Sequence, residues 1–130
     1  MSQTIVAVIA AVILFGNMGG PMLPPLRIVS PADGATVRNP LAVVVETPAD
    51  LSMMTMSTHM TEHSPPHLHI SLDTRVTMPA MKHLTKVADH RYRYVFGTVA
   101  AGRHTIRVHW ADAKTHKPMN LPRTVTVNVR

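Results

Sequence analysis

The sequence predicts a mainly β protein, an antiparallel sandwich of two sheets that follows one apolar N-terminal helix. Short stretches of alternating polar and apolar residues recur from residue 26 to the C-terminus, with turn sequences between them and no helical period of useful length. All thirteen Lys and Arg and all seven Asp and Glu lie at or after Arg27, so the preceding 26 residues form a separate, uncharged region. With 130 residues, the chain has room for one domain of ordinary size beyond this region.

The N-terminal region is predicted to be a transmembrane anchor. Residues 5–15 are an unbroken apolar run, and extension to Leu23 adds one polar side chain, that of Asn17. As a helix, these nineteen residues would be about 28 Å long, enough to cross a bilayer. A cleaved signal peptide is the alternative, but residues 1–4 lack Lys and Arg and residues 15–25 lack an Ala-x-Ala cleavage sequence. We therefore expect an uncleaved anchor over residues 1–23, a Pro-rich elbow over 24–29 that leads into the first strand, and a sandwich domain over 30–130.

The expected strands are bounded by turn formers. The first strand is followed by the turn from Pro31 to Gly34, in which Pro fixes φ and Gly allows a positive φ. A second turn, over residues 100–102, joins two long strands. The expected strands are residues 26–30, 41–46, 67–73, 91–99, 103–111 and 123–130. An antiparallel sandwich of the immunoglobulin (Ig-like) type, with about seven strands, fits this pattern.

Four short motifs follow one another in the predicted domain. They are Ser-Pro-Ala-Asp-Gly-Ala-Thr-Val (30–37), His-Leu-His-Ile-Ser-Leu-Asp (67–73), Gly-Arg-His-Thr-Ile-Arg-Val (102–108) and Ala-Asp-Ala-Lys-Thr-His-Lys-Pro (111–118). In these motifs the chain resembles an uncharacterised group of bacterial exported domains with a related H-x-H-L-x-x-D strand and a G-x-H-T hairpin. The resemblance implies an Ig-like fold and export. Because the group has no settled activity, the resemblance implies no reaction.

Methionine and histidine are concentrated between residues 53 and 83, which hold six Met and five His. Thioether sulfur favours Cu(I), and imidazole binds Cu(I), Cu(II) or Zn(II), so this composition in a chain without Cys favours a copper site. His67 and His69 lie two apart on an expected strand and therefore share one face. The candidate metal ligands are His59, His63, His67, His69, Met56 and Met60. The alternative is an apolar loop in which Met53 and Met54 cover the core edge or contact a partner.

Three further histidines lie near the C-terminus. His104 shares the expected inward face of its strand with Ile106 and Val108, which predicts a satisfied histidine at the core or its rim. His109 is expected to point outward from the same strand. His116 lies in an expected loop and is the one of these three that we expect to join a metal site.

The charged residues favour neither nucleic-acid binding nor catalysis. The formal net charge is +6, but the basic side chains are dispersed along several strands, without an aromatic stacking platform. The seven carboxylates form no evident pair, and the sequence lacks a nucleophile elbow, a phosphate-binding loop and a His-Glu-x-x-His motif. We therefore expect a non-catalytic protein that binds no nucleic acid. Its basic face could rest on membrane lipid with anionic headgroups.

Two functions remain open at this point. The first is a structural accessory subunit of a larger membrane protein complex, for example a photosynthetic, respiratory or transport complex. It would be a single-pass protein of the inner (cytoplasmic) membrane with a periplasmic C-terminal domain. Small residues at Ala7, Ala10 and Ala11 would let its helix approach integral membrane protein subunits closely, and Met53 and Met54 would contact the partner. The second function is a periplasmic domain that binds or buffers copper, with no other cofactor expected.

Overall fold

The computed structural model of the protein describes residues 23–51, 66–77 and 83–130. The predicted membrane anchor therefore lies, apart from Leu23, outside the described residues. Within the three described ranges, no helix is long and apolar enough to cross a membrane.

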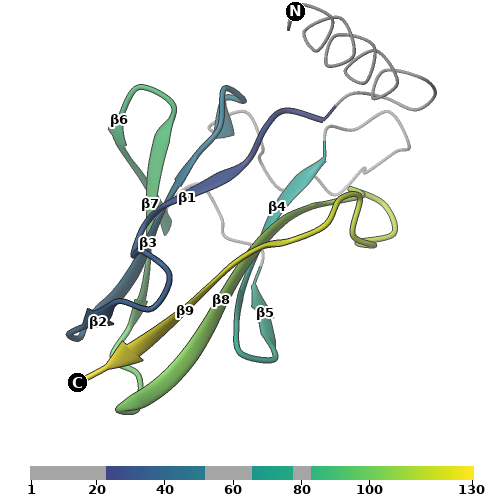
Figure 1. Ribbon diagram of the computed structural model, residues 1–130. Coiled ribbons are helices and arrows are strands. Elements are labelled where there is room, and N and C mark those ends of the chain that lie inside the picture. The colour runs from purple at the N-terminus through teal and green to yellow at the C-terminus, as the bar shows by residue number, and fades with distance from the viewer. Residues whose placement is uncertain (1–22, 52–65, 78–82) are drawn as a thin grey trace, which may run out of the picture.

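The described residues form two β-sheets (Figure 1). Their nine strands are β1 (Arg27–Ser30), β2 (Thr36–Val37), β3 (Leu41–Glu46), β4 (His67–Leu72), β5 (Arg75–Thr77), β6 (Leu84–Ala88), β7 (Arg91–Gly97), β8 (Gly102–Ala111) and β9 (Arg123–Val129). One sheet has the order β1-β3-β7-β6 and the other the order β2-β9-β8-β4-β5. The neighbouring strands are antiparallel except for β2 and β9, which pair in parallel.

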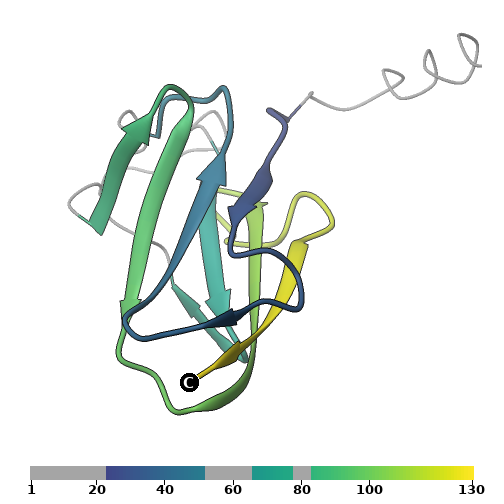
Figure 2. The ribbon, with the colours of Figure 1, turned by 60° about the vertical axis from the view of Figure 1, so that its left-hand side comes forward.

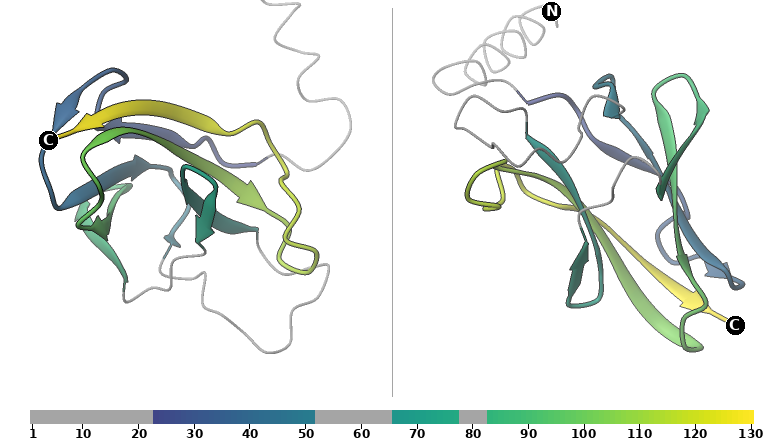
Figure 3. Two further views of the ribbon diagram at one scale, coloured as in Figure 1. Left: turned by 90° about the horizontal axis from the view of Figure 1, so that it is seen from below. Right: turned by 180° about the vertical axis from the view of Figure 1, so that it is seen from behind.

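This strand order is that of an Ig-like sandwich. The first, second, fifth and fourth strands of such a fold form one sheet, and the third, sixth and seventh form the other. Here β1, β3, β7 and β6 form the first of these sheets, and β4, β8 and β9 form the centre of the second. The two sheets lie against each other in the views of Figures 2 and 3. The predicted two-sheet β architecture is thus confirmed, with nine strands in the described residues rather than about seven.

The core lies between the two sheets and follows the period of two expected for strands that are buried on one face. In β3, every second residue is buried, beginning with Leu41. From the opposite sheet, Ile106, Val108 and Trp110 of β8 are all 0% exposed. The Nε1 of Trp110 donates a hydrogen bond of 2.9 Å to the carbonyl oxygen of Pro24. The chain therefore joins the sandwich beside the end of β8.

The first strand of the sandwich is divided between the two sheets. After β1, the chain crosses over and β2 pairs with the end of β9. The predicted turn lies at this crossing, where the amide of Ala35 donates to the oxygen of Ala32 and Gly34 has φ 84°. A positive φ at this position is typical of a type II turn and favours glycine. The side chain of Asp33 also accepts a hydrogen bond from the amide of Thr126, which fixes the turn to β9.

Candidate functional site

The outer face of the five-stranded sheet carries a group of buried histidines. Strands β4 and β8 pair with His69 opposite His109. Since Leu68 and Ile70 point into the core, His67 and His69 must point to the opposite face. His67, His69 and His109 are only 5%, 7% and 8% exposed, respectively, although they lie on the face away from the core.

A fourth histidine is brought to this face by the loop between β8 and β9. The carboxylate of Asp112 accepts hydrogen bonds of 2.9 Å from the amides of Lys114 and Thr115, and the amide of His116 donates to the Asp112 carbonyl oxygen. This turn closes at His116, whose φ of 62° lies in the left-handed region. The loop lies beside the start of β4 (Figures 1 and 3). We call His67, His69, His109 and His116 the histidine cluster.

The rings of the histidine cluster are close neighbours. The ring centre of His69 is 5.3 Å from that of His109 and 5.9 Å from that of His116, and the centres of His67 and His116 are 6.3 Å apart. The Nε2 atom of His69 is buried and has no hydrogen-bond partner among the described residues. Leaving such a polar atom unpaired costs about 1–3 kcal/mol. The unpaired nitrogen is therefore a feature for which the fold alone gives no reason.

The histidines of the sheet are held in the neutral form. Burial, followed by the nearby His109, His116 and His67, lowers the pKa of His69 to about 4. Burial and the neighbouring His116 also lower the pKa of His67, against an opposing effect of Asp112, and burial lowers the pKa of His109. Neutral imidazole has a free lone pair on one ring nitrogen and can accept a proton, a hydrogen bond or a metal ion.

The histidine cluster contains several potential metal ligands, but they are not arranged as a complete metal centre. In the described part of the chain, no three His, Asp or Glu side chains are arranged to hold a metal ion together. With a metal–nitrogen bond of about 2.0–2.1 Å and about 1.1 Å from nitrogen to ring centre, two imidazoles whose nitrogens point at one ion from opposite sides have centres about 6.2–6.4 Å apart. The separations of His116 from His67 and His69 are close to this value. Pairs of these rings can therefore share one ion after rotation of their side chains.

The predicted site residues divide into two groups. His67 and His69 share one face, as their spacing predicts, and His116 lies next to both. His109 points away from the core as predicted, but it is buried beside His69, which the sequence pattern did not reveal. The other candidates lie outside the described residues, and their roles stay predictions: His59, His63, Met56, Met60, Met53, Met54, Ala7, Ala10 and Ala11.

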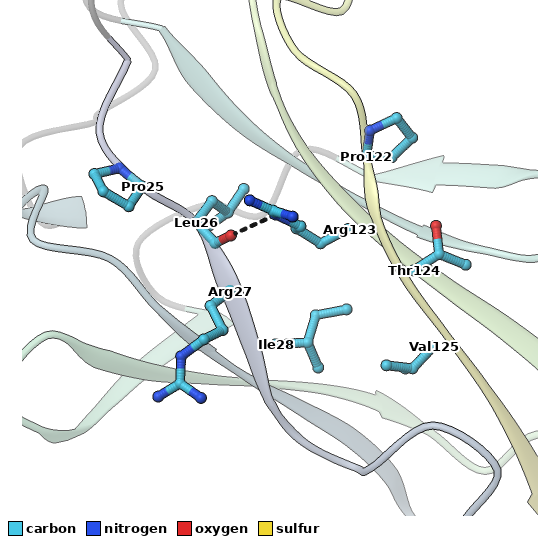
Figure 4. Close-up of a pocket in the computed structure, with 8 residues that line it drawn as sticks. All are labelled: Pro25, Leu26, Arg27, Ile28, Pro122, Arg123, Thr124 and Val125. Carbon is cyan, nitrogen blue, oxygen red and sulfur yellow. Dashed lines mark hydrogen bonds between the residues drawn. The ribbon is translucent and has the colours of Figure 1, made fainter. Parts of the chain in front are cut away.

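A hollow in the surface lies away from the cluster. It has a volume of about 550 Å³ and runs between residues 25–28 and 122–125 (Figure 4). Arg123 crosses it and donates a hydrogen bond of 3.1 Å from Nε to the carbonyl oxygen of Leu26. Its described lining residues include neither histidine nor a carboxylate. This hollow therefore offers no ligands for a metal ion, and the histidine cluster remains the candidate site.

His104 is separate from the cluster and has a structural role. Its Nδ1 is 2.7 Å from Oδ2 of Asp73 and its Nε2 is 2.6 Å from the carbonyl oxygen of Ala100. Both neighbours are acceptors, so a doubly protonated ring satisfies both. The hydrogen bond to Asp73, followed by that to Ala100, raises the pKa of His104. The expectation of a satisfied histidine agrees with this geometry.

These opposite pKa shifts predict a stability maximum near neutral pH. Between about pH 4 and 6.5 the unfolded chain binds more protons than the native one, because the pKa of His69 is lowered, so stability rises with pH. The raised pKa of His104 stabilises the native state below about pH 6.5, and this contribution is lost as pH rises through the native pKa. Urea unfolding from pH 5 to 9 measures both trends. His104→Asn should remove the decline above pH 6.5, and an unchanged decline in that variant would contradict the assignment.

Comparisons with known proteins agree with the fold. No family model and no curated protein matches the chain. Among solved structures, it is similar to part of an endo-β-1,4-mannanase from Thermotoga petrophila, with a TM-score of 0.52 and 13% identity over 90% of this chain. The chain spans 22% of that enzyme's length. Fibronectin(III)-like modules of Clostridium thermocellum CbhA match with a TM-score of 0.48 and 16% identity, over 82% of this chain and 96% of theirs.

Proposed function

We propose that this Ig-like domain binds a transition metal ion through the histidine cluster, and that copper is the physiological ion. The observation that carries the proposal is the buried, unpaired Nε2 of His69 beside three further imidazoles. A metal ion bound there would satisfy a nitrogen that otherwise destabilises the fold. Imidazole suits copper and zinc, and the thioethers of the neighbouring sequence favour copper.

The proposal keeps the predicted ligands of the preceding segment. His59, His63, Met56 and Met60 precede β4 by few residues in the sequence and could complete the coordination of an ion held by His67 and His69. Replacement of these four residues, separately from those of β4 and β8, measures their contribution.

Metal titration of the full chain tests this function. We expect about one copper ion per chain, with at least tenfold weaker binding in His69→Ala. The matched control is His90→Asn, because His90 is an exposed histidine in a turn and its φ of 64° is tolerated by Asn. Equal affinity in His69→Ala and His90→Asn would contradict a site at the cluster.

The second candidate function is the membrane-anchored accessory subunit in the periplasm. It is supported by the hydrogen bond from Trp110 to Pro24, which places the start of the described chain at the same end of the sandwich as the β8–β9 loop (Figure 2). In this loop Leu121 is 87% exposed, and Lys114 and Lys117 are exposed as well. A loop with an exposed apolar side chain and two exposed cations suits an anionic lipid surface or the extramembrane surface of a partner.

Extraction of the native membrane in mild detergent, followed by native sizing and mass spectrometry, tests the accessory role. We expect co-migration with integral membrane protein subunits at fixed stoichiometry. A polar replacement at Ala10 should release the protein from them while circular dichroism of the sandwich stays unchanged. Migration of the unaltered protein as a small free species would contradict this role.

A further inference from the structure

We infer that the histidine cluster is built for monovalent copper, Cu(I), held chiefly by His69 and His116, rather than for a divalent ion. This inference rests on the proposed metal-binding function and adds the charge state and the ligand number of the ion. It depends on the geometry of the rings, the charges around them and the place of the unpaired nitrogen.

The geometry favours an ion that needs few ligands. Zn(II) in proteins usually takes four ligands in a tetrahedron. In the described residues no three suitable side chains converge, but the rings of His69 and His116 have centres 5.9 Å apart. Two imidazoles on opposite sides of one ion need about this separation, given a metal–nitrogen bond of about 2.0–2.1 Å. A two-coordinate ion therefore requires less rearrangement than a four-coordinate one: the planes of the two rings lie 18° apart, and the ring of His116 must turn so that one nitrogen of each ring faces the ion.

The choice of His69 and His116 follows from their environments. His69 supplies the buried Nε2 without a partner in the described chain. His116 is the most exposed member of the cluster and lies on a loop, so its ring can rotate with little repacking. The sheet thus provides one fixed nitrogen and the loop provides one adjustable nitrogen.

The surrounding charges favour a monovalent ion. Lys114 and Lys117 flank His116 in the loop, whereas Arg107, on the same face of β8 as His109, donates a hydrogen bond of 3.2 Å from Nη1 to the carbonyl oxygen of Asp73. Asp112 is the acidic residue of this loop, and its Oδ1 already accepts hydrogen bonds from two backbone amides. Asp73, at the end of β4, contacts His104 and the Thr105 amide instead. The described loop around His116 therefore carries two positive charges and one negative charge.

The buried position of the histidine cluster also favours a monovalent ion. The cost of moving an ion from water into a medium of low polarity rises with the square of its charge, so this cost is about four times larger for a divalent ion than for a monovalent ion of equal size. Anionic ligands, such as carboxylates or thiolates, offset part of that cost where a site contains them. The cluster offers neutral nitrogens in a buried position, which suits the smaller charge.

Competition titrations of the full chain test the inference. Under anaerobic conditions with ascorbate, the protein competes with a chromophoric Cu(I) chelator, and parallel titrations use Zn(II) and, without reductant, Cu(II). We expect one Cu(I) per chain, bound at least a hundredfold more tightly than Zn(II), and an X-ray absorption spectrum typical of two or three nitrogen ligands. Both His69→Ala and His116→Asn should weaken Cu(I) binding at least tenfold, whereas His90→Asn should not.

The outcomes separate the inference from the proposed function. Preferred binding of Zn(II) or Cu(II), lost in His69→Ala, would overturn the Cu(I) inference and retain a metal site. Tight Cu(I) binding that is unaffected in both His69→Ala and His116→Asn would place the ion elsewhere and overturn the inference too. Absence of binding for all three ions would contradict the proposed function itself. His116→Asn protects the test against misfolding, because His116 is exposed and Asn tolerates its backbone conformation.

Discussion

Replacement of Trp110 by Ala is expected to lower the free energy of unfolding by about 3–5 kcal/mol, more than any other single substitution in the described core. Trp110 is 0% exposed and has the largest fully buried side chain of the described residues. Its removal leaves a cavity between the sheets and deprives the Pro24 carbonyl oxygen of its donor. A domain of this size has only about 5–15 kcal/mol of stability, so the loss is a large fraction of the total.

The matched control is Trp110→Phe, which keeps an aromatic ring in the core but lacks the Nε1 donor. We expect it to lose about 1–2 kcal/mol, the range for one hydrogen bond together with imperfect packing. Because Trp110 is the only tryptophan, unfolding should be followed by circular dichroism in all three proteins. A loss below about 1 kcal/mol in Trp110→Ala would show that the N-terminal part of the sandwich does not depend on this side chain.

Strands with a buried face were predictable from the sequence, and exposed edge strands were not. The predicted strand at residues 41–46 coincides with β3. The bounds of β4, β8 and β9 differ from the predicted bounds by no more than one residue at either end. By contrast, β5 and β6 lie at sheet edges and are mostly exposed, so they have no buried apolar face that would mark them in the sequence. β2 has only two residues and depends on its pairing with β9, a contact distant in sequence.

The candidate site was predictable only where local spacing determines it. The shared face of His67 and His69 follows from the period of a strand. The position of His109 depends on the register between β4 and β8, which is fixed by long-range pairing. His116 reaches the cluster because Asp112 closes a turn onto two backbone amides and His116 adopts a positive φ. The sequence Asp-Ala-Lys-Thr could have indicated such a turn, since Asp side chains commonly bind backbone amides two or three residues later.

Replacement of His69 by Leu is expected to have opposite effects on the metal-free and the metal-bound protein. Without metal, the variant should be more stable than the natural chain by about 1–3 kcal/mol, because it removes the buried, unpaired Nε2 and puts an apolar side chain of similar volume in its place. With Cu(I) at about a hundred times its dissociation constant, the natural chain should gain about 2.7 kcal/mol, whereas the variant should gain little.

Urea unfolding measures both effects. Each protein is unfolded once with a strong chelator and once under anaerobic conditions with buffered Cu(I). The order of stability should reverse between the two conditions, with His90→Asn following the natural chain in each. A variant that is less stable than the natural chain without metal would mean that His69 has a structural role in the apo protein. Reversal of the stability order between the two conditions is specific to a metal ligand. A residue kept for packing cannot destabilise the apo protein and stabilise only the metal-bound one. Such a reversal would explain why four imidazoles gather beside one another on the outer face of the sheet, where packing of the core does not require them.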